Sequence, residues 1–392
     1  MGFEVEVERI LPGGMGLAHA EGKTVFVSLA APGDRVRVRV EREQGKVLFA
    51  SIEEILVPSP SRIEPPCPYF GRCGGCDFQQ LTYKAQLEAK AEIIRDCLHR
   101  IARLESVPEI VVMPSPENWR YRMRATWQID EELRTVGYYE RGSRRVCDVV
   151  DCAVLQPELQ AKLAEVRATE WYQFPPGMKH LDVVVGESGA SFAPEFAEFE
   201  TRELSLTVKG AVYRYNAEAF FQVNPSLLGP LIDFALADAS GESALDLYSG
   251  VGLFTLPLAR RFKNVVAVEA NSTATRFARR NLQDAELANA RVITDTVTDW
   301  FRNGPTTAVD FVLLDPPRAG AESAVIKGIV DLHPAAISYV SCDPATLARD
   351  LKKLIEGGYT LDTIAAFDLF PQTHHVETVV HLSHKKAKKA QK

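Results

Sequence analysis

Two segments in the C-terminal part of this 392-residue chain contain residues that could perform covalent chemistry on a pyrimidine ring. Cys342 follows the apolar run AISYVS, and Asp343 and Pro344 after it are typical of the start of a helix. A thiol beside a helix N-terminus is expected to favour its thiolate form. A thiolate can add to C6 of uracil, which makes C5 nucleophilic toward an electrophilic methyl group. Glu377, in HHVETV, could then remove the C5 proton as a general base.

A second group of residues is typical of a pocket for a nucleotide-like cofactor. In LDLYSGVG a strand ends near Tyr248, and a turn with two glycines, which lets a backbone approach a ligand closely, precedes a helix. Thr255 stands where a dinucleotide-binding motif has its third glycine. Glu269 closes the next strand, where a carboxylate could bind two ribose hydroxyls. These features favour an adenosyl cofactor that lacks a pyrophosphate.

Two further segments could complete this pocket. Asp315, in LLDPPR, follows a strand at the edge where open α/β sheets bind ligands, and the two prolines stiffen the exit. Arg318 could contact a phosphate or form a surface ion pair. The amide of Gln222, in FFQVNP, could bind the amino-acid end of a cofactor, with Phe220 and Phe221 packing or stacking beside it.

A cysteine-rich loop predicts a metal site. Cys67, Cys73 and Cys76 are spaced CxxxxxCxxC in a glycine-rich segment, a set that suits a soft metal ion or a cluster. Cys147 and Cys152 are the candidates for a fourth ligand. A Cys₄ zinc site and a [4Fe–4S] cluster are both compatible with this spacing. The odd total of seven cysteines argues against a disulfide framework.

The order of predicted elements indicates how these residues are positioned. Residues 216–384 alternate strand-like and helical runs, which predicts a parallel, doubly wound sheet. Its last two strands, joined by PQTHH, could pair antiparallel at the edge. Residues 1–58 contain four or five short alternating strands with glycine-rich turns, typical of a small OB-like barrel. Residues 59–215 read as a central α+β domain with the cysteine loop, and residues 385–392 as a basic tail.

Composition and charge narrow the class of protein. No apolar run approaches the roughly 20 residues of a membrane span, and the N-terminus lacks a signal-peptide core, so we expect a cytoplasmic protein without a membrane partner. The net charge of −7 argues weakly against a nucleic-acid partner. However, RVRVRVER, WRYRMR and ERGSRR are local basic stretches that could contact RNA. We expect a monomer.

At this point the chain resembles the RNA 5-methyluridine methyltransferase family. The runs FFQVNP, LDLYSGVGLFTLPLA, LLDPPRAG, YVSCDPATLARDL and FPQTHHVETV occur in the family's order. The N-terminal barrel is similar to a TRAM domain, an RNA-binding module. The resemblance implies a class I, Rossmann-like methyltransferase domain, S-adenosylmethionine as methyl donor, Cys342 as nucleophile and Glu377 as base. It places at the cofactor Gln222, Tyr248, Glu269, Asp315 and, with less support, Asp295.

Within the family, the chain is more similar to the members that carry a cluster than to the tRNA-specific ones, which lack the barrel and the cysteine loop. This implies a [4Fe–4S] cluster held by the three loop cysteines and by Cys152, which precedes a short V-L run, whereas Cys147 departs from the pattern. It also implies methylation of uracil C5 in 23S rRNA, on a base that is single-stranded or flipped out. The alternatives are a catalytically silent RNA-binding or ribosome-assembly factor and a methyltransferase for tRNA uridine or for cytosine.

Overall fold

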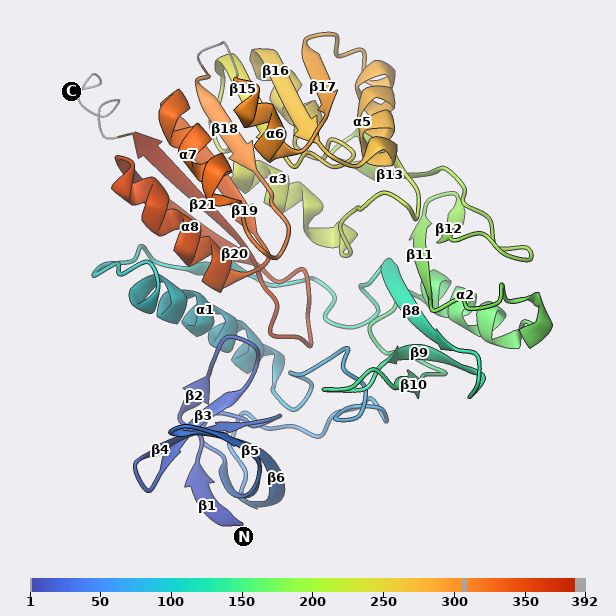
Figure 1. Ribbon diagram of the computed structural model, residues 1–392, viewed down its shortest axis with the longest axis vertical. Coiled ribbons are helices and arrows are strands. Elements are labelled where there is room, and N and C mark those ends of the chain that lie inside the picture. The colour runs from blue at the N-terminus through green and yellow to red at the C-terminus, as the bar shows by residue number, and fades with distance from the viewer. Residues whose placement is uncertain (1, 305–308, 385–392) are drawn as a thin grey trace.

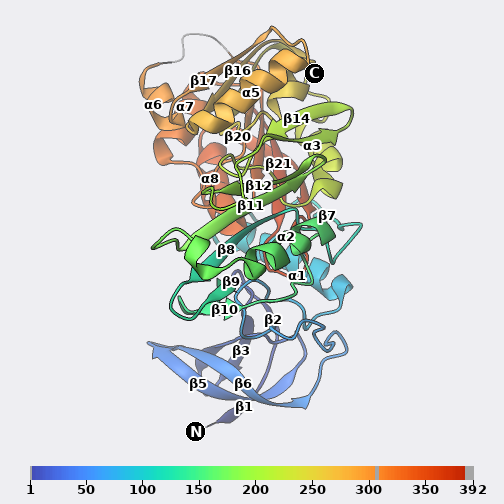
Figure 2. The same cartoon turned by 90° about the vertical axis from the view of Figure 1, so that its right-hand side faces the viewer.

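The computed structural model describes residues 2–304 and 309–384, so the predicted basic tail lies outside the described residues. Figures 1 and 2 show an elongated molecule with a small N-terminal barrel at one end and a large mixed sheet at the other. A second sheet lies between them. None of the described helices combines the length and the apolar character that a membrane-spanning segment needs.

The N-terminal module is a curved sheet of six strands around a core of small aliphatic side chains. In its fifth strand Val36 and Val38 are buried, while Arg35 and Arg39 are exposed, as period-two alternation predicts. Irregular register along the longest strand pair lets the sheet bend. The strands, in the sheet order β1-β5-β6-β4-β3-β2, are β1 (Phe3–Glu6), β5 (Arg35–Gln44), β6 (Val47–Val57), β4 (Lys23–Val27), β3 (Gly16–Ala20) and β2 (Arg9–Ile10).

The central region combines an antiparallel sheet with one helix, and the helix, α2 (Pro157–Ala168), lies against it. The fully buried Trp127 belongs to its core. A hairpin of β13 (Leu204–Val208) and β14 (Ala211–Tyr215) follows. The sheet strands, in spatial order, are β10 (Val146–Asp148), β9 (Thr135–Tyr139), β8 (Arg124–Asp130), β11 (His180–Gly186) and β12 (Gly189–Ala193).

The C-terminal sheet has eight strands, and its central strands are parallel, as the alternating pattern predicts. β21 runs antiparallel between β19 and β20, so the predicted antiparallel pairing of the last two strands is confirmed. All four residues of β18 are buried, as expected where helices cover both faces. The strands, in spatial order, are β17 (Ala290–Thr294), β16 (Phe262–Glu269), β15 (Gly241–Leu247), β18 (Phe311–Leu314), β19 (Ala336–Ser341), β21 (Glu377–His384), β20 (Tyr359–Phe367) and β7 (Val111–Met113).

Two apolar cores lie on opposite faces of this sheet. One face is covered by α3, α4 and α5, and the other by α1, α6, α7 and α8. The helices are α1 (Tyr83–Arg100), α3 (Leu228–Leu236), α4 (Thr255–Ala259), α5 (Ser272–Asp284), α6 (Val297–Arg302), α7 (Ser323–Leu332) and α8 (Pro344–Glu356), and the short 3₁₀ turns are η1 (Trp171–Gln173) and η2 (Pro225–Leu227).

The predicted boundary at residue 215 does not separate two independent bodies. Helix α1 packs against α8, and Ile94 and Leu98 of α1 belong to the same core as Leu351. Strand β7 adds a parallel edge strand beside β20. Thr82 caps the start of α1, but local periodicity does not reveal which distant surface a helix covers. Residues 83–113 therefore belong in space to the C-terminal sheet.

Candidate active site

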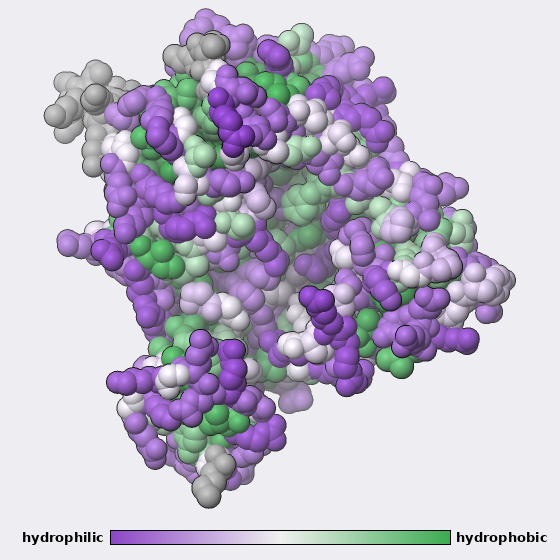
Figure 3. Space-filling view, in the orientation of Figure 1, coloured by the Kyte–Doolittle hydropathy of each residue, from purple (hydrophilic) through white to green (hydrophobic). Residues whose placement is uncertain are grey.

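Strand register brings Cys342 and Glu377 together. Ser341, the last residue of β19, pairs with Thr378 in antiparallel β21. Cys342 follows the first of these and Glu377 precedes the second, so the two residues leave neighbouring strands at the same edge of the sheet. Both line one cavity of about 890 Å³. The hollow in the middle of the face shown in Figure 3 lies between the C-terminal sheet and the central region.

The start of α8 has the predicted form, but the thiol does not have the predicted charge. Asp343 is the N-cap and accepts a hydrogen bond from the Thr346 amide at 2.8 Å, and Pro344 is the first helical residue. Burial raises the pKa of Cys342 to about 12, and the nearby carboxylates of Glu377 and Asp315 add to this effect. The prediction that the helix N-terminus favours the thiolate is therefore wrong, because burial and negative neighbours outweigh it.

Glu377 has the surroundings of a strong base. Its side chain is 2 % exposed, and its Oε1 has no hydrogen-bond partner among the described residues. Burial raises the pKa of Glu377 well above its usual range, Asp315 raises it further, and Arg318 lowers it. A raised pKa makes the ionised carboxylate a stronger proton acceptor, so this residue can serve as a general base.

The predicted cofactor residues occupy the same cavity. Gln222, Tyr248, Glu269 and Asp315 line it, whereas Asp295 is not among its lining residues, although the following Thr296 is. The Glu269 carboxylate accepts hydrogen bonds from the amides of Gly250 at 3.0 Å and Asn271 at 2.7 Å. Gly250 and Gly252 have φ of +55° and +93°, values that glycine adopts without strain. The glycine turn thus holds the carboxylate at the end of β16.

A fourth carboxylate, which was not predicted as a site residue, lies in the strand that leads to the glycine turn. Asp246 in β15 is fully buried and accepts a hydrogen bond from the Thr255 hydroxyl, and burial raises its pKa to about 7. Burial, together with Asp246 and Glu269, also raises the pKa of Asp315 to about 7. The signal was present, since an acidic residue interrupts the apolar strand ALDLY. This concentration of negative charge favours a bound cation.

The FFQVNP segment is held from the central sheet. Arg124 in β8 donates to the backbone oxygens of Ala219 at 2.6 Å and Ala217 at 2.7 Å. Its guanidinium also lies 5.9 Å from the ring centre of Phe220, which is 58 % exposed and lines the cavity. Part of the basic stretch WRYRMR therefore positions this segment. Similarly, Arg37 of RVRVRVER pairs with Glu4 and Glu54 of its own barrel.

A second, small cavity of about 30 Å³ gathers the cysteine loop. Cys67, Cys73, Cys76 and Cys152 line it, whereas Cys147, buried in β10, does not. The remaining lining includes apolar and aromatic side chains and Arg122. Burial, above all, raises the pKa of Cys73 to about 12. No group of three or more His, Cys, Asp or Glu in the described residues is set close enough to hold a metal ion, so what supports a metal centre is the shared cavity and its four thiols.

Comparisons with known proteins agree with this geometry. The family model for tRNA (uracil-5-)-methyltransferases matches residues 184–302 and 305–385, and the model for the TRAM domain of tRNA (uracil(54)-C(5))-methyltransferases matches residues 3–61. The 23S rRNA (uracil(1939)-C(5))-methyltransferase RlmD of Pectobacterium atrosepticum is 33% identical over 97% of this chain and 93% of its own length. An uncharacterized RNA methyltransferase of Thermotoga maritima is 31% identical over 97% of this chain and 98% of its own length.

A solved tRNA enzyme shows the same architecture. Because the matching TRAM-domain model is also that of tRNA enzymes, the expectation that tRNA-specific members lack the barrel is wrong. The tRNA (uracil-54, C5)-methyltransferase of Pyrococcus abyssi, in complex with S-adenosyl-L-homocysteine, superposes with a TM-score of 0.73 and 26% identity, over 96% of this chain and 100% of that chain. The fold prediction of a class I methyltransferase domain with a TRAM-like barrel is thereby confirmed. The chain belongs to the family of RNA uracil-5-methyltransferases.

Proposed function

We propose that this enzyme methylates C5 of a uridine in 23S rRNA through a covalent bond between Cys342 and C6 of the ring. The observation that carries the proposal is the strand register that sets Cys342 beside Glu377 on the wall of one cavity. The four predicted cofactor residues on the same cavity support S-adenosylmethionine as the methyl donor.

The first steps form the S–C6 and C5–CH₃ bonds and break the S–H bond, the C5–C6 π bond and the sulfonium S–CH₃ bond. The Cys342 thiol gives its proton to water, and its sulfur bonds to C6 of uracil. The electron pair of the C5–C6 double bond then attacks the methyl carbon of the sulfonium, which leaves neutral S-adenosylhomocysteine. The carboxylates of the buried Asp246 and of Glu269 and Asp315 at the cavity favour the positively charged sulfonium over the neutral product.

The last steps release the base. Glu377 takes the proton from C5, the electrons of that bond restore the C5–C6 double bond, and the Cys342 sulfur leaves C6. The net reaction exchanges one hydrogen of uracil for one methyl group and releases one proton. The raised pKa of Glu377 suits this proton transfer.

A uracil must leave its stack to reach the thiol. The exposed ring of Phe220 at the cavity offers a surface on which a flipped base could stack. The relatives named as 23S rRNA methyltransferases are 31% and 33% identical over nearly the whole chain, against 26% for the solved tRNA enzyme, which favours rRNA as the substrate. The solved tRNA enzyme shares the same architecture, so tRNA is the comparison substrate for the test.

The cysteine cavity supports a [4Fe–4S] cluster held by Cys67, Cys73, Cys76 and Cys152. The methyl transfer above moves no electrons to or from the protein, so such a cluster would hold the loop in shape. Absorbance near 400 nm and iron content of anaerobically purified protein test this assignment, and zinc without iron would overturn it.

Covalent trapping tests the reaction. The protein and S-adenosylmethionine are incubated with 5-fluorouridine-substituted 23S rRNA or tRNA, then run on a denaturing gel. Fluorine cannot leave C5 as a cation, so we expect a stable protein–rRNA adduct that Cys342→Ala abolishes and Cys97→Ala, a buried cysteine outside the cavity, retains. An adduct with tRNA alone would overturn the substrate assignment. Methylation of ordinary RNA without any adduct would overturn the Cys342 mechanism.

A further inference from the structure

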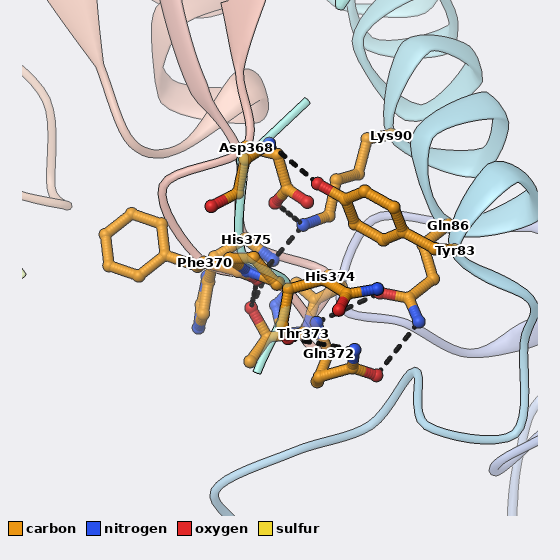
Figure 4. A network of polar contacts seen from close by, with 12 residues as sticks. Tyr83, Gln86, Lys90, Asp368, Phe370, Gln372, Thr373, His374 and His375 are labelled. Carbon is orange, nitrogen blue, oxygen red and sulfur yellow. Dashed lines mark hydrogen bonds and ion pairs between the residues drawn. The ribbon is translucent and has the colours of Figure 1, made fainter. Parts of the chain in front are cut away.

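The connector between β20 and β21, residues 368–376, forms part of the active-site wall. It leaves the sheet after Phe367 and returns at Glu377, and these two residues are register partners. From within it, Phe370 lines the catalytic cavity. Strand pairing fixes the position of Glu377 at the C-terminal end of the connector. The shape of the connector decides where the rest of this wall, including Phe370, lies. Figure 4 shows that side chains of α1 face this connector.

Lys90 of α1 binds the first part of the connector. It is fully buried, and its ammonium pairs with the equally buried carboxylate of Asp368. It also donates a hydrogen bond to the backbone oxygen of Phe370 at 3.0 Å. A buried ion pair contributes little net stability, because removing both charges from water is costly, but it fixes geometry. One side chain thus sets the distance between two connector residues (Figure 4).

Gln86, one turn earlier in α1, binds the middle of the connector. Its Oε1 accepts from the Gln372 amide at 3.0 Å, and its Nε2 donates to Gln372 Oε1 at 2.9 Å and to Leu81 O at 3.1 Å. Gln372 has φ of +69°, a left-handed conformation that residues other than glycine seldom adopt. Such a conformation persists when surrounding contacts impose it, and Gln86 supplies two of these contacts.

The cysteine loop binds the connector from another side. The amides of Asp77 and Phe78 donate to the Gln372 oxygen at 3.1 and 3.0 Å. The Asp77 carboxylate accepts from the His374 amide at 2.7 Å and contacts His374 Nδ1 at 2.5 Å. Asp77 directly follows Cys76, so the loop that carries three of the cavity cysteines is joined by four polar contacts to the connector that precedes Glu377.

We propose that Gln86, Lys90 and Asp77 are positioning residues for methyl transfer, which hold the connector so that Phe370 and Glu377 keep their places beside Cys342. The described residues that line the catalytic cavity include none of these three, so each acts through the connector. The inference rests on the proposed reaction. It also assigns a task to α1 and the cysteine loop, which brace the catalytic wall from nearly 300 positions away in the sequence.

The first test separates positioning from stability. Gln86→Leu removes three hydrogen bonds at nearly constant size. Its matched control is Asn289→Leu, which removes the two hydrogen bonds from the Asn289 amide to the Ala259 and Phe262 oxygens, near the amino-terminal end of β16. Methyl transfer to 23S rRNA is measured at a temperature where both variants are folded. We expect Gln86→Leu to lower kcat about 10-fold or more with KM for RNA and cofactor within about 2-fold, and Asn289→Leu to keep kcat.

The second test does not depend on turnover. Hydrogen exchange of residues 368–376 is compared in the wild type and in the variants Gln86→Leu, Asp77→Ala and Asp77→Asn. Asparagine can still accept from the His374 amide, so it should restore slow exchange and kcat, whereas alanine should lose both. Unchanged connector exchange in Gln86→Leu and Asp77→Ala would overturn the inference, as would faster exchange with an unchanged kcat. A wild type that does not methylate RNA would overturn the proposed function. Hydrogen exchange would still show whether Gln86 and Asp77 hold the connector in place.

Discussion

Two cavities of this protein are lined by cysteine, and their surroundings indicate a reactive thiol in one and structural thiols in the other. The larger cavity holds one thiol, Cys342, beside the carboxylates of Asp315 and Glu377. The smaller holds four thiols and no carboxylate among its lining residues in the described chain. A thiol that adds to a ring needs a base and room for substrate, whereas thiols that share a cluster need only one another. The neighbours of a cysteine, more than its burial, therefore indicate its task.

The largest expected effect comes from replacing Glu377, which tests whether Cys342 and Glu377 act in different steps. Glu377→Gln should lower methyl transfer by about 10²–10⁴-fold, the usual contribution of a general base. Because Cys342 is intact, the adduct with ordinary, fluorine-free RNA should still form and should accumulate, since the C5 proton has no acceptor. A denaturing gel measures the adduct. Loss of adduct and product together would mean that Glu377 acts before methyl transfer.

Substitution of a cysteine in the smaller cavity should change iron content and stability. Cys76→Ser should reduce iron content and lower the free energy of unfolding by about 2–3 kcal/mol, because one ligand of a structural centre is lost. Thermal melts and iron analysis measure these changes. With Cys147→Ser as the control outside the cavity, only the Cys76 variant should lose iron. Equal iron loss in both would show that the ligand set is wrongly assigned.

Charge at the larger cavity should appear in cofactor binding. The pKa values of Asp246 and Asp315 are raised to about 7, so both carboxylates become charged as pH rises through neutrality. The cationic methyl donor should then gain affinity over neutral S-adenosylhomocysteine, by up to about 10-fold between pH 6 and pH 8.5. Titration calorimetry with both ligands measures the ratio. Asp315→Asn should flatten its pH dependence, and a ratio that falls with pH would contradict the assignment.

The smallest effect concerns stability. A carboxyl group whose pKa is raised in the folded state stabilises the protein below its unfolded pKa of about 4, and this stabilisation is lost as pH rises through the folded pKa of about 7. Through Asp246 and Asp315 together, the ligand-free protein should therefore lose about 1–3 kcal/mol of unfolding free energy between pH 5 and pH 8. Denaturant titrations of the wild type and Asp246→Asn at both pH values measure the slope, which the substitution should reduce.

Much of the C-terminal half could be predicted because its signals are local. The alternating strands and helices, the glycine turn before α4 and the Asp343-Pro344 start of α8 each depend on residues close together in the chain. Asp246 was missed because a carboxylate within a strand reads as a strand end. The charge of Cys342 was predicted wrongly because the helix start is local, whereas burial, which raises the pKa of the thiol most, and the carboxylates from two other strands depend on the tertiary structure.

The sequence by itself determined the sheet type, the order of the motifs and the candidates for nucleophile and base, because periodicity, turn residues and side-chain chemistry depend on neighbouring residues. Only the tertiary structure decided that Cys342 and Glu377 lie side by side, that the four cysteines assigned to the cluster share one cavity, and that α1 and Asp77 brace the connector before Glu377. These are contacts between segments far apart in the chain. They depend on strand register and on which surfaces pack together, and no local pattern encodes either.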